Sequence, residues 1–152
     1  MSQRDRAILL VEDNPGDVKL MLRALKLNQI TNEVVVARDG VEALDYLFGD
    51  GNDSEWSPCV LPEIVLLDLN LPKVNGIEVL RRIKADERTQ MLPVIMLTTS
   101  TEERDVVTSY QLGVNSYVQK PMDFDVFSLA VRELSHYWLG LNINPPLPGT
   151  GQ

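Results

Sequence analysis

Cysteine and histidine are nearly absent from the sequence, which contains one residue of each, Cys59 and His136. A single cysteine cannot form an intramolecular disulfide bond, and its neighbours Pro58 and Val60 offer no metal-ligand spacing, so we interpret Cys59 as an inert loop thiol. His136 is interpreted as a surface or packing residue. With 152 residues, the chain has the length of one ordinary domain and can bury most of its apolar side chains in one core without a disulfide or structural metal.

Long hydrophobic runs and basic clusters are also missing. No stretch approaches the roughly 18 apolar residues of a membrane span, and residues 1–6 lack the apolar segment of a secretory signal, so we expect a cytoplasmic protein. Acidic residues outnumber basic residues by 22 to 14, which gives a net charge of -8. This balance, without a stripe of Lys and Arg, argues against nucleic acid or an anionic membrane as a partner and favours a basic surface or a cation.

Short apolar or β-branched segments predict five β-strands, at residues 7–11, 33–37, 64–67, 93–98 and 116–119. The first, third and fourth are apolar throughout, as is typical of strands buried on both faces. Each strand is followed by a segment of helical periodicity. The start signals of these helices are Asn14 with Pro15, Asp39, Asn75, residues 100–103 and Asp123, and Gly113 ends the fourth helix.

Five alternating strand and helix units without an internal repeat predict an α/β domain: a parallel sheet with helices on both faces and right-handed crossovers. Residues 49–62 are rich in Gly, Asn, Asp, Ser and Pro and predict a long loop. The last helix carries an apolar stripe made of Phe124, Phe127, Val131, Leu134 and Trp138. We place the domain at residues 1–139 and expect residues 140–152 to form a Pro-rich, extended tail that cannot continue the helix.

Polar side chains follow four of the predicted strands. Glu12 and Asp13 follow the first strand, Asp68 follows the third, Thr98 closes the fourth and Lys120 follows the fifth. One such acid alone would indicate only a helix cap or a turn. Ligands of open parallel sheets bind at the carboxyl ends of the strands, so the convergence of these residues predicts a functional site.

The residue types at this site favour phosphoryl transfer. Three carboxylates close together repel one another unless a cation lies among them, and oxygen ligands suit Mg²⁺, which also accepts a phosphoryl oxygen. Lys120 can pair with a carboxylate at rest and with a phosphoryl oxygen after transfer, and Thr98 can donate to another phosphoryl oxygen. One Asp then serves as the nucleophile. Acid/base hydrolysis is disfavoured because no His or second free carboxyl group is placed to activate water.

Four segments match, in order and spacing, the signatures of one family: residues 10–14 (LVEDN), 66–72 (LLDLNLP) with Gly76 beyond, 93–98 (PVIMLT) and 117–121 (YVQKP). The chain resembles a response-regulator receiver domain of two-component signalling from about Ala7 to Trp138. The resemblance implies a flavodoxin-like fold, doubly wound, with five parallel strands in the order 2-1-3-4-5. It also implies a phosphoacceptor switch that catalyses only its own phosphorylation and dephosphorylation and is not otherwise an enzyme.

The same resemblance assigns roles at the acidic end of the site. Asp68 would accept a phosphoryl group from a phosphohistidine of a sensor histidine kinase. Asp13, Asp68 and the backbone carbonyl of Asn70 would bind Mg²⁺, and Glu12 would act on the metal through bound water. Asn70 and Ser100, two residues beyond Asp68 and Thr98, are expected to tune the phosphate lifetime.

The remaining roles concern the switch. Thr98 and Lys120 would bind the phosphoryl group, and Tyr117 would rotate inward as Thr98 moves. The Lys120–Pro121 bond is expected to be cis by this resemblance. Glu12, Thr99 and Met122 depart from commoner receivers, but none of them removes a required group.

Further features resemble the stand-alone regulators that accompany phytochrome-type kinases of bacteria and cyanobacteria. They are the long loop before residue 64, residues 67–73 (LDLNLPK), the run Thr98-Thr99-Ser100, and Tyr137-Trp138-Leu139 followed by a Pro-rich tail. A phytochrome-type histidine kinase is therefore the expected partner. The alternative is an intermediate phosphorelay protein that passes its phosphate to a histidine phosphotransfer protein.

Two other protein classes are compatible with such a sheet. A flavin-binding electron carrier needs hydroxyls and glycines after the first strand, where this chain has Glu12-Asp13-Asn14-Pro15. A phosphatase with an aspartyl nucleophile normally has a second acid two residues on, where this chain has Asn70. We rank both below the receiver domain.

Output is expected to pass through surfaces, since the sequence predicts no effector domain after Trp138. Phosphorylation would change the face made by the fourth helix, fifth strand and fifth helix, and with it homodimerisation or partner docking. The motivating residues are Phe124, Phe127, Tyr137, Trp138, Leu141, Ile143 and Leu147. The alternative is that the apolar stripe is core and the tail is disordered.

Overall fold

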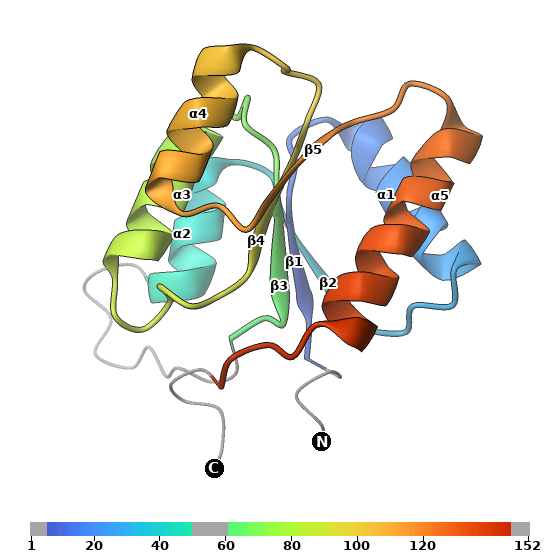
Figure 1. Ribbon diagram of the computed structural model, residues 1–152, viewed down its shortest axis with the longest axis horizontal. Coiled ribbons are helices and arrows are strands. Elements are labelled where there is room, and N and C mark those ends of the chain that lie inside the picture. Colours follow the sequence, from blue (N-terminus) through green and yellow to red (C-terminus); the bar gives the residue numbers. More distant parts are fainter. Residues whose placement is uncertain (1–5, 50–60, 147–152) are drawn as a thin grey trace.

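The computed structural model describes residues 6–49 and 61–146. At its centre lies one sheet of parallel strands in the order β2-β1-β3-β4-β5, formed by β1 (Ile8–Val11), β2 (Val34–Ala37), β3 (Ile64–Leu67), β4 (Val94–Thr98) and β5 (Ser116–Gln119) (Figure 1). The predicted doubly wound α/β fold and strand order are confirmed. The order reverses between β1 and β3, and the crevice at such a reversal is where ligands of these sheets bind.

Helices cover both faces of the sheet, as predicted. They are α1 (Pro15–Leu27), α2 (Gly40–Phe48), α3 (Gly76–Ala85), α4 (Glu103–Leu112) and α5 (Phe124–His136). Figure 1 shows α1 and α5 on one face and α2, α3 and α4 on the other. Within the described residues, every helix is too short or too polar to serve as a transmembrane segment.

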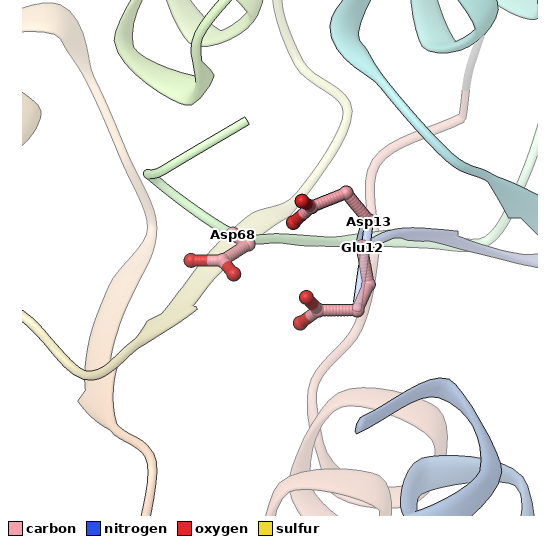
Figure 2. Close-up of side chains that lie close together, drawn as sticks. All are labelled: Glu12, Asp13 and Asp68. Carbon is pink, nitrogen blue, oxygen red and sulfur yellow. The ribbon is translucent and has the colours of Figure 1, made fainter. Parts of the chain in front are cut away.

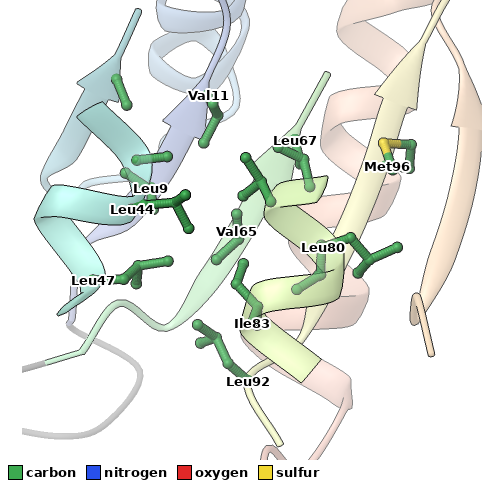
Figure 3. Packing of buried hydrophobic residues seen from close by; sticks show 14 of the residues in the cluster. Leu9, Val11, Leu44, Leu47, Val65, Leu67, Leu80, Ile83, Leu92 and Met96 are labelled. Carbon is green, nitrogen blue, oxygen red and sulfur yellow. The ribbon is translucent and has the colours of Figure 1, made fainter. Parts of the chain in front are cut away.

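Alternation along the central strands divides the core into two layers. One set of alternating strand residues packs with Leu80 and other residues of α2 and α3 (Figure 3); it consists of Leu9, Val11, Val65 and Leu67. The intervening residues Ile8, Leu10, Ile64 and Leu66 pack with side chains of α1 and α5, among them Val18, Met21, Phe127 and Val131. All residues of β1, β3 and β4 are buried, whereas β2 and β5 at the edges are mostly half-buried. The acids of the predicted site therefore follow strands that are buried on both faces.

Side-chain caps begin four of the helices at the residues that the sequence predicts. Asn14, Asp39, Asn75 and Asp123 each accept a hydrogen bond from a backbone N–H in the first turn of the following helix. The fourth helix differs from the prediction: α4 begins after Glu102, whose side chain makes no capping hydrogen bond. Gly113 ends α4 with a φ of 102°, a left-handed conformation that glycine adopts without strain.

The segment after α5 departs from the prediction. A π-helical turn, Tyr137–Leu141, continues the helix through Gly140, so the expectation that Gly140 could not do so is wrong. Trp138 is buried in the layer beneath α1 and α5. Beyond the turn, the Asn144 side-chain amide donates hydrogen bonds to the Trp138 carbonyl (3.2 Å) and the Glu63 carboxylate (2.5 Å).

The apolar stripe of α5 is core, as the alternative interpretation held. Phe127 and Trp138 of this stripe are buried. Tyr137, Leu141 and Ile143 are exposed. Cys59, Leu147, residues 50–60 of the long loop and residues 147–152 of the tail lie outside the described residues.

Candidate functional site

The acidic residues meet because β1 and β3 are neighbours in register. Val11 is paired with Leu67, so Glu12 and Asp68 leave the sheet side by side. The backbone N–H of Asp68 donates to the Val11 carbonyl (3.0 Å), which extends the pairing by one residue. Carboxylate oxygens of Glu12, Asp13 and Asp68 lie within 4.8 Å of one another (Figure 2). The structure thus brings together all three predicted acids.

The three acids differ in how far they are buried. Glu12 and Asp68 are buried, whereas Asp13 is exposed. Burial raises the pKa of Glu12 to about 7; the hydrogen bond from Lys120 opposes this shift and the charge of Asp68 adds to it. Buried negative charge of this kind is stabilised by a cation among the oxygens.

Lys120 lies opposite the acids and donates to three carboxylates. Its Nζ is 2.5 Å from Glu12 Oε1, 3.0 Å from Asp17 Oδ2 and 3.2 Å from Asp68 Oδ2. Burial by itself lowers the pKa of Lys120, but the hydrogen bonds to Glu12 and Asp17 and the charge of Asp68 raise it above its ordinary value. The three carboxylates therefore favour the charged form of Lys120.

Asp17 was missed by the sequence interpretation. It lies in the first turn of α1, where an acid ordinarily indicates a favourable interaction with the helix dipole. The only available signal was that α1 begins at the same end of the sheet as the predicted site. The contact with Lys120 joins residues 103 positions apart and appears only in the folded chain.

Thr98, Ser100 and Tyr117 form a second group at the end of β4. Thr98 is fully buried, and its Oγ1 accepts a hydrogen bond from the Ser100 backbone N–H (3.3 Å). The Tyr117 hydroxyl donates to the Ser100 carbonyl (2.9 Å), and burial raises the pKa of Tyr117. Ser100 Oγ donates to the Asp105 carboxylate of α4 (2.6 Å), a contact that the sequence did not predict. A shift of Thr98 can therefore reach both α4 and β5.

The loop after β3 is fixed close to Asp68. Asn70 is exposed, and its backbone N–H donates a long hydrogen bond to Asp68 Oδ1 (3.4 Å). Gly76 approaches so closely that a Cβ there would lie 2.2 Å from the Asp68 carbonyl oxygen. The glycine is thus needed for α3 to pack against the acidic site.

Two expectations away from the acids can be compared with the structure. The described residues contain no cis peptide bond, so the expected cis Lys120–Pro121 bond is wrong, and this bond has the trans form that X–Pro bonds intrinsically favour. His136 is the last residue of α5, a helix of 13 residues, and it is exposed. It is therefore a surface residue, far along this helix from the strand ends.

This arrangement is a set of oxygen ligands for a cation beside a fixed ammonium group, with a buried hydroxyl on the neighbouring strand. The response regulator receiver domain family matches residues 8–132. The chain belongs to this family. Receiver domains are signalling switches that interact with histidine kinases.

Relatives cover nearly the whole chain. Probable methanogenesis regulatory protein FilR2 of Methanothrix harundinacea is 46% identical over 138 residues, which are 91% of this chain and 86% of FilR2. Response regulator Rcp1 of Synechocystis is 40% identical over 139 residues, which are 91% of this chain and 92% of Rcp1.

Solved structures agree with the fold. The phosphorylated cyanobacterial phytochrome response regulator RcpA has a TM-score of 0.83 at 39% identity, and the alignment covers 92% of this chain and 98% of RcpA. The Mn²⁺-bound form of Rcp1 has a TM-score of 0.81 at 38% identity, with 92% of this chain and 99% of that chain covered. The family membership favours the receiver interpretation over the flavin carrier and the phosphatase.

Proposed function

We propose that Asp68 accepts a phosphoryl group from a phosphohistidine of a sensor histidine kinase. The observation that carries the proposal is the pairing of Lys120 with Asp68 beside the cluster of Glu12, Asp13 and Asp68. An Asp68 carboxylate oxygen forms the new P–O bond as the P–N bond breaks, and the imidazole nitrogen keeps the electron pair and takes up a proton. Lys120 then binds a phosphoryl oxygen. This charge-assisted contact contributes more free energy in a partly buried site than it would in water.

The carboxylates fit a divalent cation, for which we propose Mg²⁺. Asp13, Asp68 and the carbonyl of Asn70 would bind it directly, and Glu12 would act through bound water. The 4.8 Å grouping of oxygens supports this set, as does the binding of Mn²⁺ by Rcp1. When bound, the cation would neutralise charge on the acids and on the incoming phosphoryl group.

The switch residues follow from the second group. Thr98 would donate its hydroxyl to a phosphoryl oxygen, and its movement would break its contact with Ser100 and draw Tyr117 inward. The chain of hydrogen bonds from Thr98 through Ser100 to Tyr117 supports this coupling. Asn70 and Ser100 would tune the phosphate lifetime, because they flank the approach of attacking water. The protein would catalyse only its own phosphorylation and dephosphorylation.

For the partner, we propose a sensor histidine kinase of the phytochrome type, and for this protein we propose a cytoplasmic location. The similarity to RcpA supports the phytochrome assignment. The relative named probable methanogenesis regulatory protein FilR2 is 46% identical, so a kinase with another input is the competing candidate. The kinase encoded beside this chain can be labelled and co-purified with this protein. Phosphotransfer measured in red and in far-red light then distinguishes a phytochrome-type kinase from a kinase with another input. The net charge of -8 argues against nucleic acid or membrane partners.

Output would pass through the face of α4, β5 and α5, by homodimerisation. Exposed apolar side chains on the two helices support this surface: Val107, Tyr110, Val126 and Leu129. Sedimentation with and without a beryllofluoride phosphate mimic tests it, and an unchanged monomer would contradict it. For the alternative of a phosphorelay intermediate, labelled phosphate should pass to a histidine phosphotransfer protein rather than only to water.

Labelling by a cognate kinase in the presence of Mg²⁺ tests the phosphoacceptor. The wild type should gain a base-labile phosphoryl group, and Asp68→Asn should gain none. Asp45→Asn, a change of an exposed aspartate on α2, is the matched control and should be labelled as the wild type is. Base-labile label that persists on Asp68→Asn would overturn the assignment.

A further inference from the structure

The Lys120 ammonium uses its three hydrogen-bond donors on three carboxylates from three parts of the fold. Glu12 follows β1, Asp68 follows β3 and Asp17 lies in α1. Glu12 and Asp68 also belong to the acidic cluster with Asp13, whereas Asp17 does not. Asp17 is thus the one carboxylate partner of Lys120 among the described residues that lies outside the cation site.

Asp17 is held in place by the start of α1. Its backbone N–H donates to Asn14 Oδ1 (3.1 Å), the side-chain cap of the helix, and Pro15 fixes the backbone in the first turn. The Asp17 side chain is 37% exposed, against 10% for Lys120. The carboxylate therefore reaches Lys120 from the solvent side, on a backbone fixed by the cap of α1 rather than by the loop that carries Asp68.

Little space surrounds this contact. Glu12, Asp17, Asp68 and Lys120 line a cavity of about 10 Å³, enough for one water molecule, together with apolar residues such as Phe127. Lys120 has no room to move toward the protein interior.

The proposed reaction affects the three carboxylate partners of Lys120 differently. Phosphorylation converts the Asp68 carboxylate into an acyl phosphate, and Glu12 would also interact, through bound water, with a cation held in the cluster. Asp17 takes no part in the transfer and lies outside the cluster of Glu12, Asp13 and Asp68. We propose that Asp17 is a positioning residue that holds the Lys120 ammonium at the phosphoryl site before and after transfer. This inference rests on the proposed function of Asp68.

A double-mutant cycle tests the inference. Acetyl phosphate at saturating Mg²⁺ serves as the phosphodonor, and intact-protein mass spectrometry measures the rate of phosphoprotein formation. Asp17→Ala should slow the rate about fivefold, as expected for the loss of one charge-assisted hydrogen bond at a partly exposed site. Asp17→Asn, which keeps an acceptor oxygen and the side-chain shape, should recover part of this loss.

The cycle itself separates positioning from a structural role of Asp17 in α1. In the Lys120→Met background, which is already slow, adding Asp17→Ala should cause no further loss, because the residue that it positions is gone. Asp125→Ala removes an acid from the first turn of α5 and is the matched control; its rate should stay within about twofold of the wild type.

The outcomes distinguish this inference from the proposed function. If the wild type forms no phosphoprotein at Asp68, the proposed function fails. If the wild type reacts and Asp17→Ala reacts at the same rate, only the role of Asp17 fails. An equal slowing by Asp17→Ala with and without Lys120 would also overturn it, since the effect would then not pass through Lys120.

Discussion

The Ser100 hydroxyl donates a hydrogen bond of 2.6 Å to the Asp105 carboxylate and so ties the end of β4 to the first turn of α4. The same hydroxyl oxygen accepts from the Glu102 backbone N–H (3.3 Å), and the Ser100 backbone contacts Thr98 and Tyr117. Ser100 is therefore the point where the buried threonine, α4 and β5 are joined. Glu102 provides no side-chain cap, so the start of α4 depends on Ser100.

Ser100→Ala is expected to loosen the first turn of α4. A hydrogen bond to a charged acceptor in a partly exposed place contributes about 1 kcal/mol, which corresponds to about fivefold faster hydrogen exchange of amides near residues 102–106. Hydrogen-exchange mass spectrometry of the α4 peptide measures this change. Thr101→Ala, in the same loop and exposed, is the control and should leave exchange unchanged. Equal exchange in Ser100→Ala and the wild type would show that the contact does not stabilise the helix start.

Gly76→Ala should destabilise the protein and disturb the acidic site. Its Cβ would lie 2.2 Å from the Asp68 carbonyl oxygen and 2.7 Å from Leu69 Cα, so backbone must move. Overpacking against backbone costs about 2 kcal/mol or more, and the shift would displace the loop that carries Asp68 and Asn70. Urea unfolding measures the free-energy loss, and the rate of phosphorylation by acetyl phosphate should fall with it.

Gly140→Ala is the matched control for this change. A Cβ at Gly140 has one ordinary contact, at 3.6 Å from His136 Cδ2. The free energy of unfolding should not fall, and it can rise by up to about 1 kcal/mol, because alanine is favoured over glycine in a helical turn. If Gly76→Ala were as harmless, the close approach of α3 to Asp68 would not be required by the fold.

Much of this fold could be predicted because local signals agree with the tertiary structure. The apolar runs of β1, β3 and β4 mark strands buried on both faces, and Asn14, Asp39, Asn75 and Asp123 each cap the helix that they were expected to start. The convergence of the acids, Thr98 and Lys120 at one sheet edge follows from parallel topology alone.

The contacts that were missed depend on distances across the fold. Asp17 and Asp105 are acids in first helical turns, and their sequence positions indicate only a favourable helix dipole. Their partners, Lys120 and Ser100, are set by the packing of α1 and α4 against the sheet. The π-helical turn at Tyr137–Leu141 was missed for a similar reason: burial of Trp138 favours continued helix at a glycine that local propensity disfavours.

Lys84 links the end of α3 to the starts of β4 and β5 without a carboxylate among its hydrogen-bond acceptors. Its Nζ donates to the carbonyls of Gln90 (3.2 Å) and Leu92 (2.9 Å) and to Asn115 Oδ1 (3.1 Å). Burial lowers the pKa of Lys84 to about 8, below the ordinary value of 10.5. The folded protein thus holds its Lys84 proton less tightly than the unfolded chain does.

The stability of the protein should therefore carry a contribution from Lys84 that rises with pH. Between about pH 8 and 10.5 the unfolded chain binds more protons at this residue than the folded protein, so the free energy of unfolding increases with pH across that window. Lys84→Met lacks the titrating group and serves as the reference, because other residues titrate equally in both proteins. Urea unfolding at intervals from pH 7 to 10.5 gives the wild-type value minus the Lys84→Met value, which should climb above about pH 8. A flat or falling difference would mean that the carbonyl acceptors compensate the burial of the ammonium group in full.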